Sequence, residues 1–151
     1  MYKILVFSDT HKNTDTAINI IKNNPDTNLV LHAGDHAEDA EDLSYIFPEI
    51  SFSYVKGNCD LFSFEKEERF FEASGKKILL THGHLYKVKM TLSLLRKRAK
   101  ELGADIVVFG HTHQRLIEED DGILYLNPGS RGSYGQITID KDKISADIFD
   151  I

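Results

Sequence analysis

The segment MYKILVFSDTH, residues 1–11, decides the expected fold. Tyr2 to Ser8 is a nearly continuous apolar run, which is typical of a strand buried on both faces. Asp9, Thr10 and His11 follow at once, so polar side chains stand where this strand ends. Open α/β sheets place their ligand sites beyond the carboxyl ends of their strands. The segment therefore predicts an α/β protein with a polar site at one edge of its sheet.

The same arrangement of an apolar run followed by polar residues recurs along the chain. The later islands are Gly34-Asp35, Gly57-Asn58-Cys59-Asp60, Thr81-His82-Gly83-His84 and Gly110-His111-Thr112-His113. Carboxylate, amide and imidazole groups bind divalent metal ions. Glycines precede three of the candidate ligands and permit a sharp turn or a close backbone approach. Together the islands predict a dinuclear metal site, a kind of centre that often cleaves phosphate esters.

The remainder of the chain predicts alternating strands and helices with a β-rich second half. Helices are expected at 14–24, 37–47 and 90–102, and strands at 28–33, 51–55, 69–73, 76–81, 105–109, near 114–119, 123–127 and 134–140, and at 143–150. Ser74-Gly75 and Asp121-Gly122 are turn signals between strands. We expect a single α/β domain over residues 1–151, an αββα sandwich in which two sheets face each other and helices lie outside.

Composition excludes several classes of function. The net charge of −6 argues against an extended nucleic-acid groove, which needs clustered Lys and Arg. Apolar runs fall short of the ~20 residues of a membrane span. A single cysteine cannot form an internal disulfide, and Met1 leads directly into a strand without a signal peptide. These features predict a cytoplasmic protein that does not bind membranes.

The spacing within the islands suits metal binding. Residues i and i+2 of an extended segment project to the same side, so Asp9 and His11 can converge on one ion. His111 and His113 can likewise present imidazoles to neighbouring ions. Asp35 can bridge the two, because a carboxylate has two oxygens. Two divalent ions carry more charge than Asp9 and Asp35 neutralise, and the residual positive charge favours a phosphate substrate.

In this order, the motifs resemble those of the calcineurin-like metallophosphoesterases. The Cys59 variant and the short chain are most similar to the YfcE-like branch of small phosphodiesterases. The segment Asn127-Pro128-Gly129-Ser130 also resembles a tail motif of that branch. The resemblance implies a pair of mixed sheets flanked by helices, and in-line attack of a metal-bound hydroxide on phosphorus.

The resemblance also implies roles for individual residues. Asp9, His11 and His113 would bind the first metal, Asn58, His82 and His111 the second, and Asp35 would bridge them. Asp35, Asn58 and His82 are the expected catalytic residues, with Cys59, His84 and Arg131 in contact with substrate. The two ions would be drawn from Mn²⁺, Ni²⁺, Fe²⁺, Co²⁺ and Zn²⁺, since this ligand set accepts all of them.

Cys59 departs from the wider superfamily, in which a histidine at this position can protonate the leaving group. A thiol with a pKa of ~8.5 is a poorer general acid at neutral pH than an imidazole near ~6.5. Asp60, the usual partner of that histidine, is present. Cys59 could instead be an inert buried thiol, and Asp60 could merely cap a turn.

Other candidate residues also have a structural interpretation. Asp9 could cap a helix, and His32, inside a strand, is expected to be a core residue or to support a ligand from behind. His36 follows the bridging Asp35 and could belong to the active site. Arg131 could clamp a phosphate or be solvated.

The leading interpretation is a metal-dependent phosphodiesterase acting on a small or accessible phosphodiester. One alternative is a phosphomonoesterase or nucleotidase that uses the same site. Another is a protein-binding scaffold of the type found in a retromer subunit, which resembles this branch. A homodimer is a further expectation from the resemblance.

Overall fold

The computed structural model describes residues 1–10, 14–60, 65–130 and 132–151. The helices are α1 (Thr14–Lys22), α2 (Ala37–Ile46) and α3 (Ser93–Leu102), with a short 3₁₀ helix η1 (His84–Tyr86). The strands are β1 (Tyr2–Phe7), β2 (Leu29–His32), β3 (Ser51–Tyr54), β4 (Glu68–Ala73), β5 (Lys76–Thr81), β6 (Ile106–Val108), β7 (Leu116–Asp120), β8 (Ile123–Asn127), β9 (Ser133–Asp140) and β10 (Lys143–Asp150).

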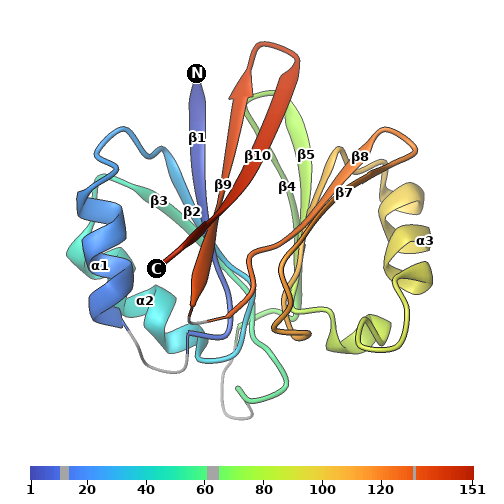
Figure 1. Ribbon diagram of the computed structural model, residues 1–151, viewed down its shortest axis with the longest axis horizontal. Coiled ribbons are helices and arrows are strands. Elements are labelled where there is room, and N and C mark those ends of the chain that lie inside the picture. Colours follow the sequence, from blue (N-terminus) through green and yellow to red (C-terminus); the bar gives the residue numbers. More distant parts are fainter. Residues whose placement is uncertain (11–13, 61–64, 131) are drawn as a thin grey trace.

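The strands form two mixed sheets that face each other (Figure 1). One sheet has the order β10-β9-β1-β2-β3, and the other has the order β4-β5-β6-β8-β7. β1, β2 and β3 are parallel, as are β5, β6 and β8. The pairs β1–β9, β9–β10, β4–β5 and β7–β8 are antiparallel. Within each sheet, the carboxyl ends of the parallel strands therefore lie at one edge.

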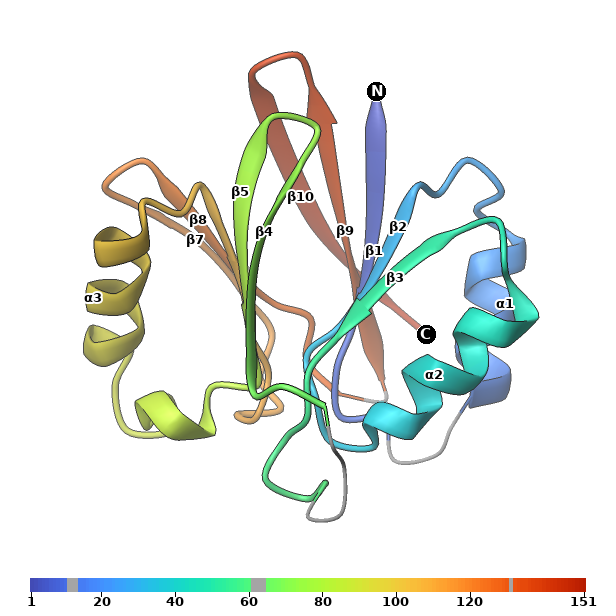
Figure 2. The same cartoon turned by 180° about the vertical axis from the view of Figure 1, so that it is seen from behind.

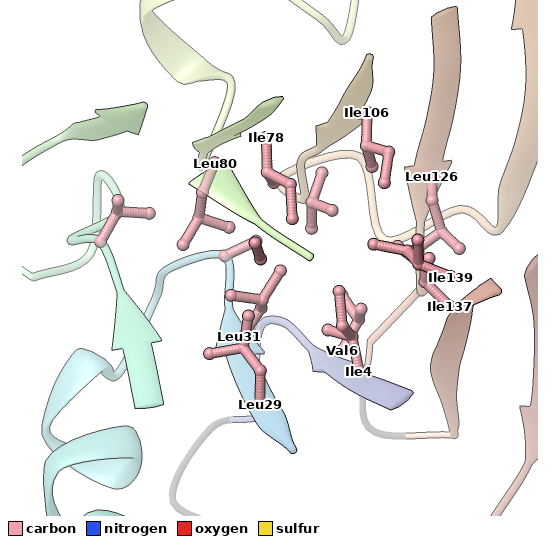
Figure 3. Close-up of a cluster of buried hydrophobic side chains, with 14 residues drawn as sticks. Ile4, Val6, Leu29, Leu31, Ile78, Leu80, Ile106, Leu126, Ile137 and Ile139 are labelled. Atoms are coloured by element: carbon pink, nitrogen blue, oxygen red, sulfur yellow. The ribbon is translucent and has the colours of Figure 1, made fainter. Parts of the chain in front are cut away.

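Apolar side chains fill three layers between these elements. A central cluster joins the facing sheets, with residues such as Val6, Leu31, Leu80 and Leu126 fully buried (Figure 3). α1 and α2 cover the outer face of the first sheet, and α3 covers the outer face of the second (Figures 1 and 2). The predicted αββα sandwich is thus confirmed, because each sheet buries one face against the other sheet and one against helices.

The expected elements are present, with shifts at their ends. The turns at Ser74-Gly75 and Asp121-Gly122 join β4 to β5 and β7 to β8, and all four residues have positive φ. The helix expected from residue 90 begins only at Ser93. The amides of Met90 and Thr91 instead donate to the carbonyl of Lys87, which forms a separate turn. No helix in the described parts of the chain is long and apolar enough to cross a membrane.

Candidate metal centre

The loops that follow β1, β2, β3, β5 and β6 emerge at the same end of the two sheets, the lower end in Figure 1. The parallel pairing of strands within each sheet produces this arrangement. It gathers the polar islands that are far apart in the sequence. The side chains that these loops present form the candidate metal centre.

Asp9 follows β1 and is fully buried. Its Oδ2 accepts hydrogen bonds from the hydroxyl of Ser8 at 2.5 Å and from the amide of His111 at 3.2 Å. Its Oδ1 is buried without a hydrogen-bond donor among the described residues, and it faces Nε2 of His113 at 3.2 Å. The alternative that Asp9 caps a helix depends on residues 11–13, which lie between Asp9 and α1 and are outside the described residues.

Asp35 is the second buried carboxylate. Its Oδ1 accepts a hydrogen bond from the amide of Cys59 at 2.9 Å, and its Oδ2 lies 3.5 Å from Nε2 of His82. The loop after β3 can approach this closely only because residue 57 is glycine. A β-carbon on Gly57 would lie 2.2 Å from Oδ1 of Asp35.

His82 has a defined tautomer. Its Nδ1 lies 2.8 Å from the carbonyl oxygen of Ala33, and a carbonyl can only accept, so Nδ1 carries the proton. Burial lowers the pKa of His82, which keeps the ring neutral and leaves a lone pair on Nε2. That lone pair faces Oδ1 of Asn58 at 3.0 Å and Nδ1 of His111 at 3.2 Å, besides the Asp35 carboxylate.

His111 and His113 occupy one short loop after β6. Both have positive φ, 70° and 61°, which L residues seldom adopt. A β-carbon on the preceding Gly110 would lie 2.0 Å from Oγ of Ser8, so this loop too depends on glycine for its approach. The ring of His111 packs 4.9 Å from that of His82, whereas His113 turns toward Asp9.

These contacts form two groups of ligand atoms that share Asp35. Asp9, Asp35 and His113 each place one ligand atom within 4.8 Å of the other two. Asp35, Asn58, His82 and His111 form the second group. Oxygen and nitrogen lone pairs converge in both groups, and Oδ1 of Asp9 meets no donor in the described chain. Such a set repels itself in the absence of a cation, so the residues fit divalent metal ions.

The carboxylates titrate differently because their environments differ. Burial raises the pKa of Asp9 to about 6, and the neighbouring Asp35 adds to this effect. For Asp35, burial opposes ionisation, but the amide of Cys59 and the nearby His82 outweigh it and lower the pKa. Burial, followed by His82, lowers the pKa of His111 to about 4. Of the two carboxylates, Asp9 is therefore the one that holds a proton in mildly acidic solution.

The remaining predicted site residues have separate outcomes. His11 and Arg131 lie outside the described residues. Cys59 is exposed, so its interpretation as a buried thiol is wrong. Partial desolvation of the exposed Cys59 side chain and then the nearby Asp35 raise the pKa of its thiol, which keeps it protonated. His84 begins η1 with its ring 5.4 Å from that of His82, and its Nδ1 is buried without a partner among the described residues.

Asp60 caps the start of α2. Its Oδ1 accepts the amides of His36 at 2.6 Å and Ala37 at 3.2 Å, at the start of α2. Its Oδ2 accepts the amide of Gly57 at 2.8 Å. The alternative that Asp60 caps a turn is thus the one the structure supports, and His36 contributes its backbone to this arrangement.

His32 supports the site from behind. Its Nδ1 accepts the amide of Gly34 at 3.1 Å, so Nε2 carries the proton and donates to Oγ1 of Thr10 at 3.0 Å. Thr10 in turn donates to Asp39 of α2 at 2.5 Å. Burial lowers the pKa of His32 to about 4, so the ring stays neutral. This buried chain connects the loops that carry Asp9 and Asp35.

Sequence analysis missed two residues that hold the ligands. Ser8 bonds to Asp9 directly, and its place just before the first island was the available signal. Asn127 was noticed only as part of the tail motif, although its amide bonds to the loop of His111 and His113. The contacts of Asn127 could not be deduced from spacing, because its partners Gly110 and Thr112 belong to the loop after β6.

Comparison with known proteins agrees with this geometry. The model of the calcineurin-like phosphoesterase superfamily domain matches residues 2–146, and the chain belongs to that family. It is 35% identical to a probable metallophosphoesterase, YsnB of Bacillus subtilis, over 97% of this chain and 90% of that protein. It is 31% identical to phosphodiesterase MJ0936 of Methanocaldococcus jannaschii, over 87% of this chain and 86% of that protein. The chain is therefore a metallophosphoesterase, and its Asp and His side chains form a possible metal site.

A solved structure shows the same fold in a protein that is not named as a phosphoesterase. Wild-type Vps29 of Entamoeba histolytica, complexed with Zn²⁺, superposes with a TM-score of 0.78 and 22% identity. The match covers 98% of each chain. At this identity, the likeness shows the fold alone.

Metal affinity is expected to depend on pH through Asp9. A metal ion must displace the proton that this carboxyl holds below a pH of about 6. The affinity for Mn²⁺, measured by isothermal titration calorimetry, should be roughly tenfold weaker near pH ~5 than near pH ~7. Asp9→Asn, which has no proton to exchange here, should bind more weakly and show a smaller pH dependence. Equal affinity of the natural chain at both pH values would contradict this role of Asp9.

Proposed function

We propose that residues 1–151 form one metallophosphoesterase domain that hydrolyses a small or accessible phosphodiester. The observation that carries this proposal is the convergence of ligand atoms on Asp35, with carboxylate, amide and imidazole groups from separate loops and an orphaned oxygen on Asp9. The name of the relative MJ0936 supports the choice of a diester.

In this proposal, two divalent ions are held by the predicted ligands. Asp9, His113 and the undescribed His11 would bind one, Asn58, His82 and His111 the other, and Asp35 would touch both. When bound, the ions supply positive charge for the phosphoryl oxygens and lower the pKa of a nucleophilic water. Mn²⁺, Ni²⁺, Fe²⁺, Co²⁺ and Zn²⁺ all suit these donors.

The protein's own contribution is to orient these groups before substrate arrives. The carbonyl of Ala33 fixes the ring of His82, and the amide of Cys59 fixes one oxygen of Asp35. We assign Asp35, Asn58 and His82 to the catalytic centre, because Nε2 of His82 lies 3.0 Å from Oδ1 of Asn58 and 3.5 Å from Oδ2 of Asp35. His84 lies beside them with an unpartnered Nδ1 in the described chain, which suits a contact with substrate. Cys59 and Arg131 remain proposed substrate contacts.

The alternatives use the same surface differently. A phosphomonoesterase or nucleotidase would place a dianion in the same site, and a scaffold would use the fold for protein contacts. The ligand positions in the described chain are all filled by side chains that can bind metal, which favours an enzyme over a scaffold. The single cysteine supports a reducing, cytoplasmic location, and homodimerisation follows only from the resemblance.

Hydrolysis should require metal. Chelation should abolish hydrolysis of bis-p-nitrophenyl phosphate, and added Mn²⁺ or Ni²⁺ should restore it, because the protein alone offers little positive charge at this centre. The measurement compares rates on this diester and on p-nitrophenyl phosphate. A faster rate on the monoester would support the alternative enzyme. Full activity of protein shown by elemental analysis to be metal-free would overturn the proposal, and saturating metal without any hydrolysis would favour the scaffold.

Cys59→His should improve the departure of basic leaving groups. An imidazole at this exposed position could donate a proton that a thiol of raised pKa cannot, and general acids contribute ~10²-fold or more when the leaving group is basic. Both oxygens of Asp60 already accept backbone amides, so the new ring would receive little help from it. We therefore expect a gain with alkyl-type leaving groups and little change with p-nitrophenolate.

The measurement is a series of diesters with leaving groups of increasing pKa, at saturating metal. Cys59→Ser serves as the control and should follow the natural chain. An identical dependence on leaving-group pKa in all three proteins would show that residue 59 does not face the scissile oxygen.

A further inference from the structure

We propose that Asn127 is a positioning residue whose side-chain amide holds the loop of His111 and His113 in the backbone conformation that directs both rings into the metal centre. The proposal rests on the assignment of these two histidines as ligands under the proposed function. It assigns a role to the first residue of the Asn127-Pro128-Gly129-Ser130 motif, to which the proposed function assigns none.

The loop needs stabilising contacts from outside it, because its backbone conformation is unfavourable. His111 and His113 both lie at positive φ, 70° and 61°, where a side chain crowds the backbone. Within the loop, the amide of Thr112 donates to the carbonyl of Gly110 at 2.8 Å. The amide of His111 donates to Asp9 at 3.2 Å. Conformations of this kind persist only where their surroundings determine them.

Asn127 supplies such a hold from the end of β8. The side chain is fully buried. Its Nδ2 donates to the carbonyl of Gly110 at 3.1 Å and to Oγ1 of Thr112 at 2.9 Å. Its Oδ1 accepts the amide of Gly129 at 3.0 Å. Because a backbone amide can only donate, this last bond fixes which end of the Asn127 side chain faces the loop.

The two bonds from Nδ2 bracket His111. Gly110 precedes it and Thr112 follows it, so one NH₂ group sets the backbone on both sides of the ligand. Oγ1 of Thr112 also accepts the amide of Gln114 at 3.1 Å, which extends the hold past His113. A carboxylate at position 127 could not donate either bond, and an apolar side chain would leave the Gly110 carbonyl with fewer donors.

The test compares Asn127→Leu with two substitutions of Thr112, which alter only the loop's side of the contact. Thr112→Val removes the hydroxyl and keeps the shape, whereas Thr112→Ser keeps the hydroxyl. Asn24→Leu is the matched control, because Asn24, which follows α1, also donates its side-chain amide to a backbone carbonyl, that of Ile20 within α1 and away from the site. Each folded variant is titrated with Mn²⁺ by calorimetry. Couplings that report φ at His111 and His113 are measured by NMR in the metal-free protein.

We expect Mn²⁺ affinity to fall at least about tenfold in Asn127→Leu and several-fold in Thr112→Val, with altered φ-dependent couplings at both histidines. Thr112→Ser and Asn24→Leu should retain the affinity and couplings of the natural chain. Natural affinity and couplings in Asn127→Leu would overturn the proposal. If that variant does not fold, natural values in Thr112→Val would overturn it.

The couplings separate this inference from the proposed function. If the natural chain binds no Mn²⁺, the metal assignment fails, and the couplings in the metal-free variants still decide whether Asn127 sets the loop. If the natural chain binds Mn²⁺ and Asn127→Leu keeps the natural affinity and couplings, Asn127 has no positioning role.

Discussion

The hydrogen bond between Nδ1 of His82 and the carbonyl of Ala33 is the contact on which the centre depends. It commits the ring proton to the side that faces the sheet, and it leaves the Nε2 lone pair directed at Asn58, His111 and Asp35. A neutral ring of the other tautomer would present a proton to these groups and would exclude a cation. The bond joins the end of β2 to the end of β5, so it also couples the two facing sheets at the site. The architecture and the chemistry therefore meet in one interaction.

The same end of the molecule tolerates unfavourable electrostatics because the layers beneath it are tightly packed. Two carboxylates, Asp9 and Asp35, are buried near each other, and the pKa of Asp9 rises to about 6 as a result. Glycines at positions 57 and 110 admit loops so close to these carboxylates and to Ser8 that any β-carbon would collide. A cation would relieve this crowding of negative charge. The fully apolar cluster between the sheets supplies the rigid support that such a site requires.

The sequence predicted most of the fold and the gathering of the islands because both follow from short-range pattern. Buried strands such as β1 appear as apolar runs, and the end of each parallel strand shows where its polar residues will lie. Contacts made across the fold could not be predicted in this way. Asp60 caps α2 from another loop, and His32 bonds to Thr10, 22 residues away. η1 was missed because three residues carry no periodicity, and the role of Asn127 depends on strand pairing that spacing does not reveal.

The central claim is that ligand atoms converge on Asp35 in order to hold two cations. The most direct measurement is metal content per chain, by elemental analysis after equilibrium dialysis against Mn²⁺, for the natural protein and for Asp35→Asn. The substitution retains an oxygen that can accept the amide of Cys59 and removes the charge shared by both groups of ligands. We predict about two ions in the natural chain and loss of at least one in the folded variant. Two ions retained in Asp35→Asn, or none in the natural chain, would contradict the account.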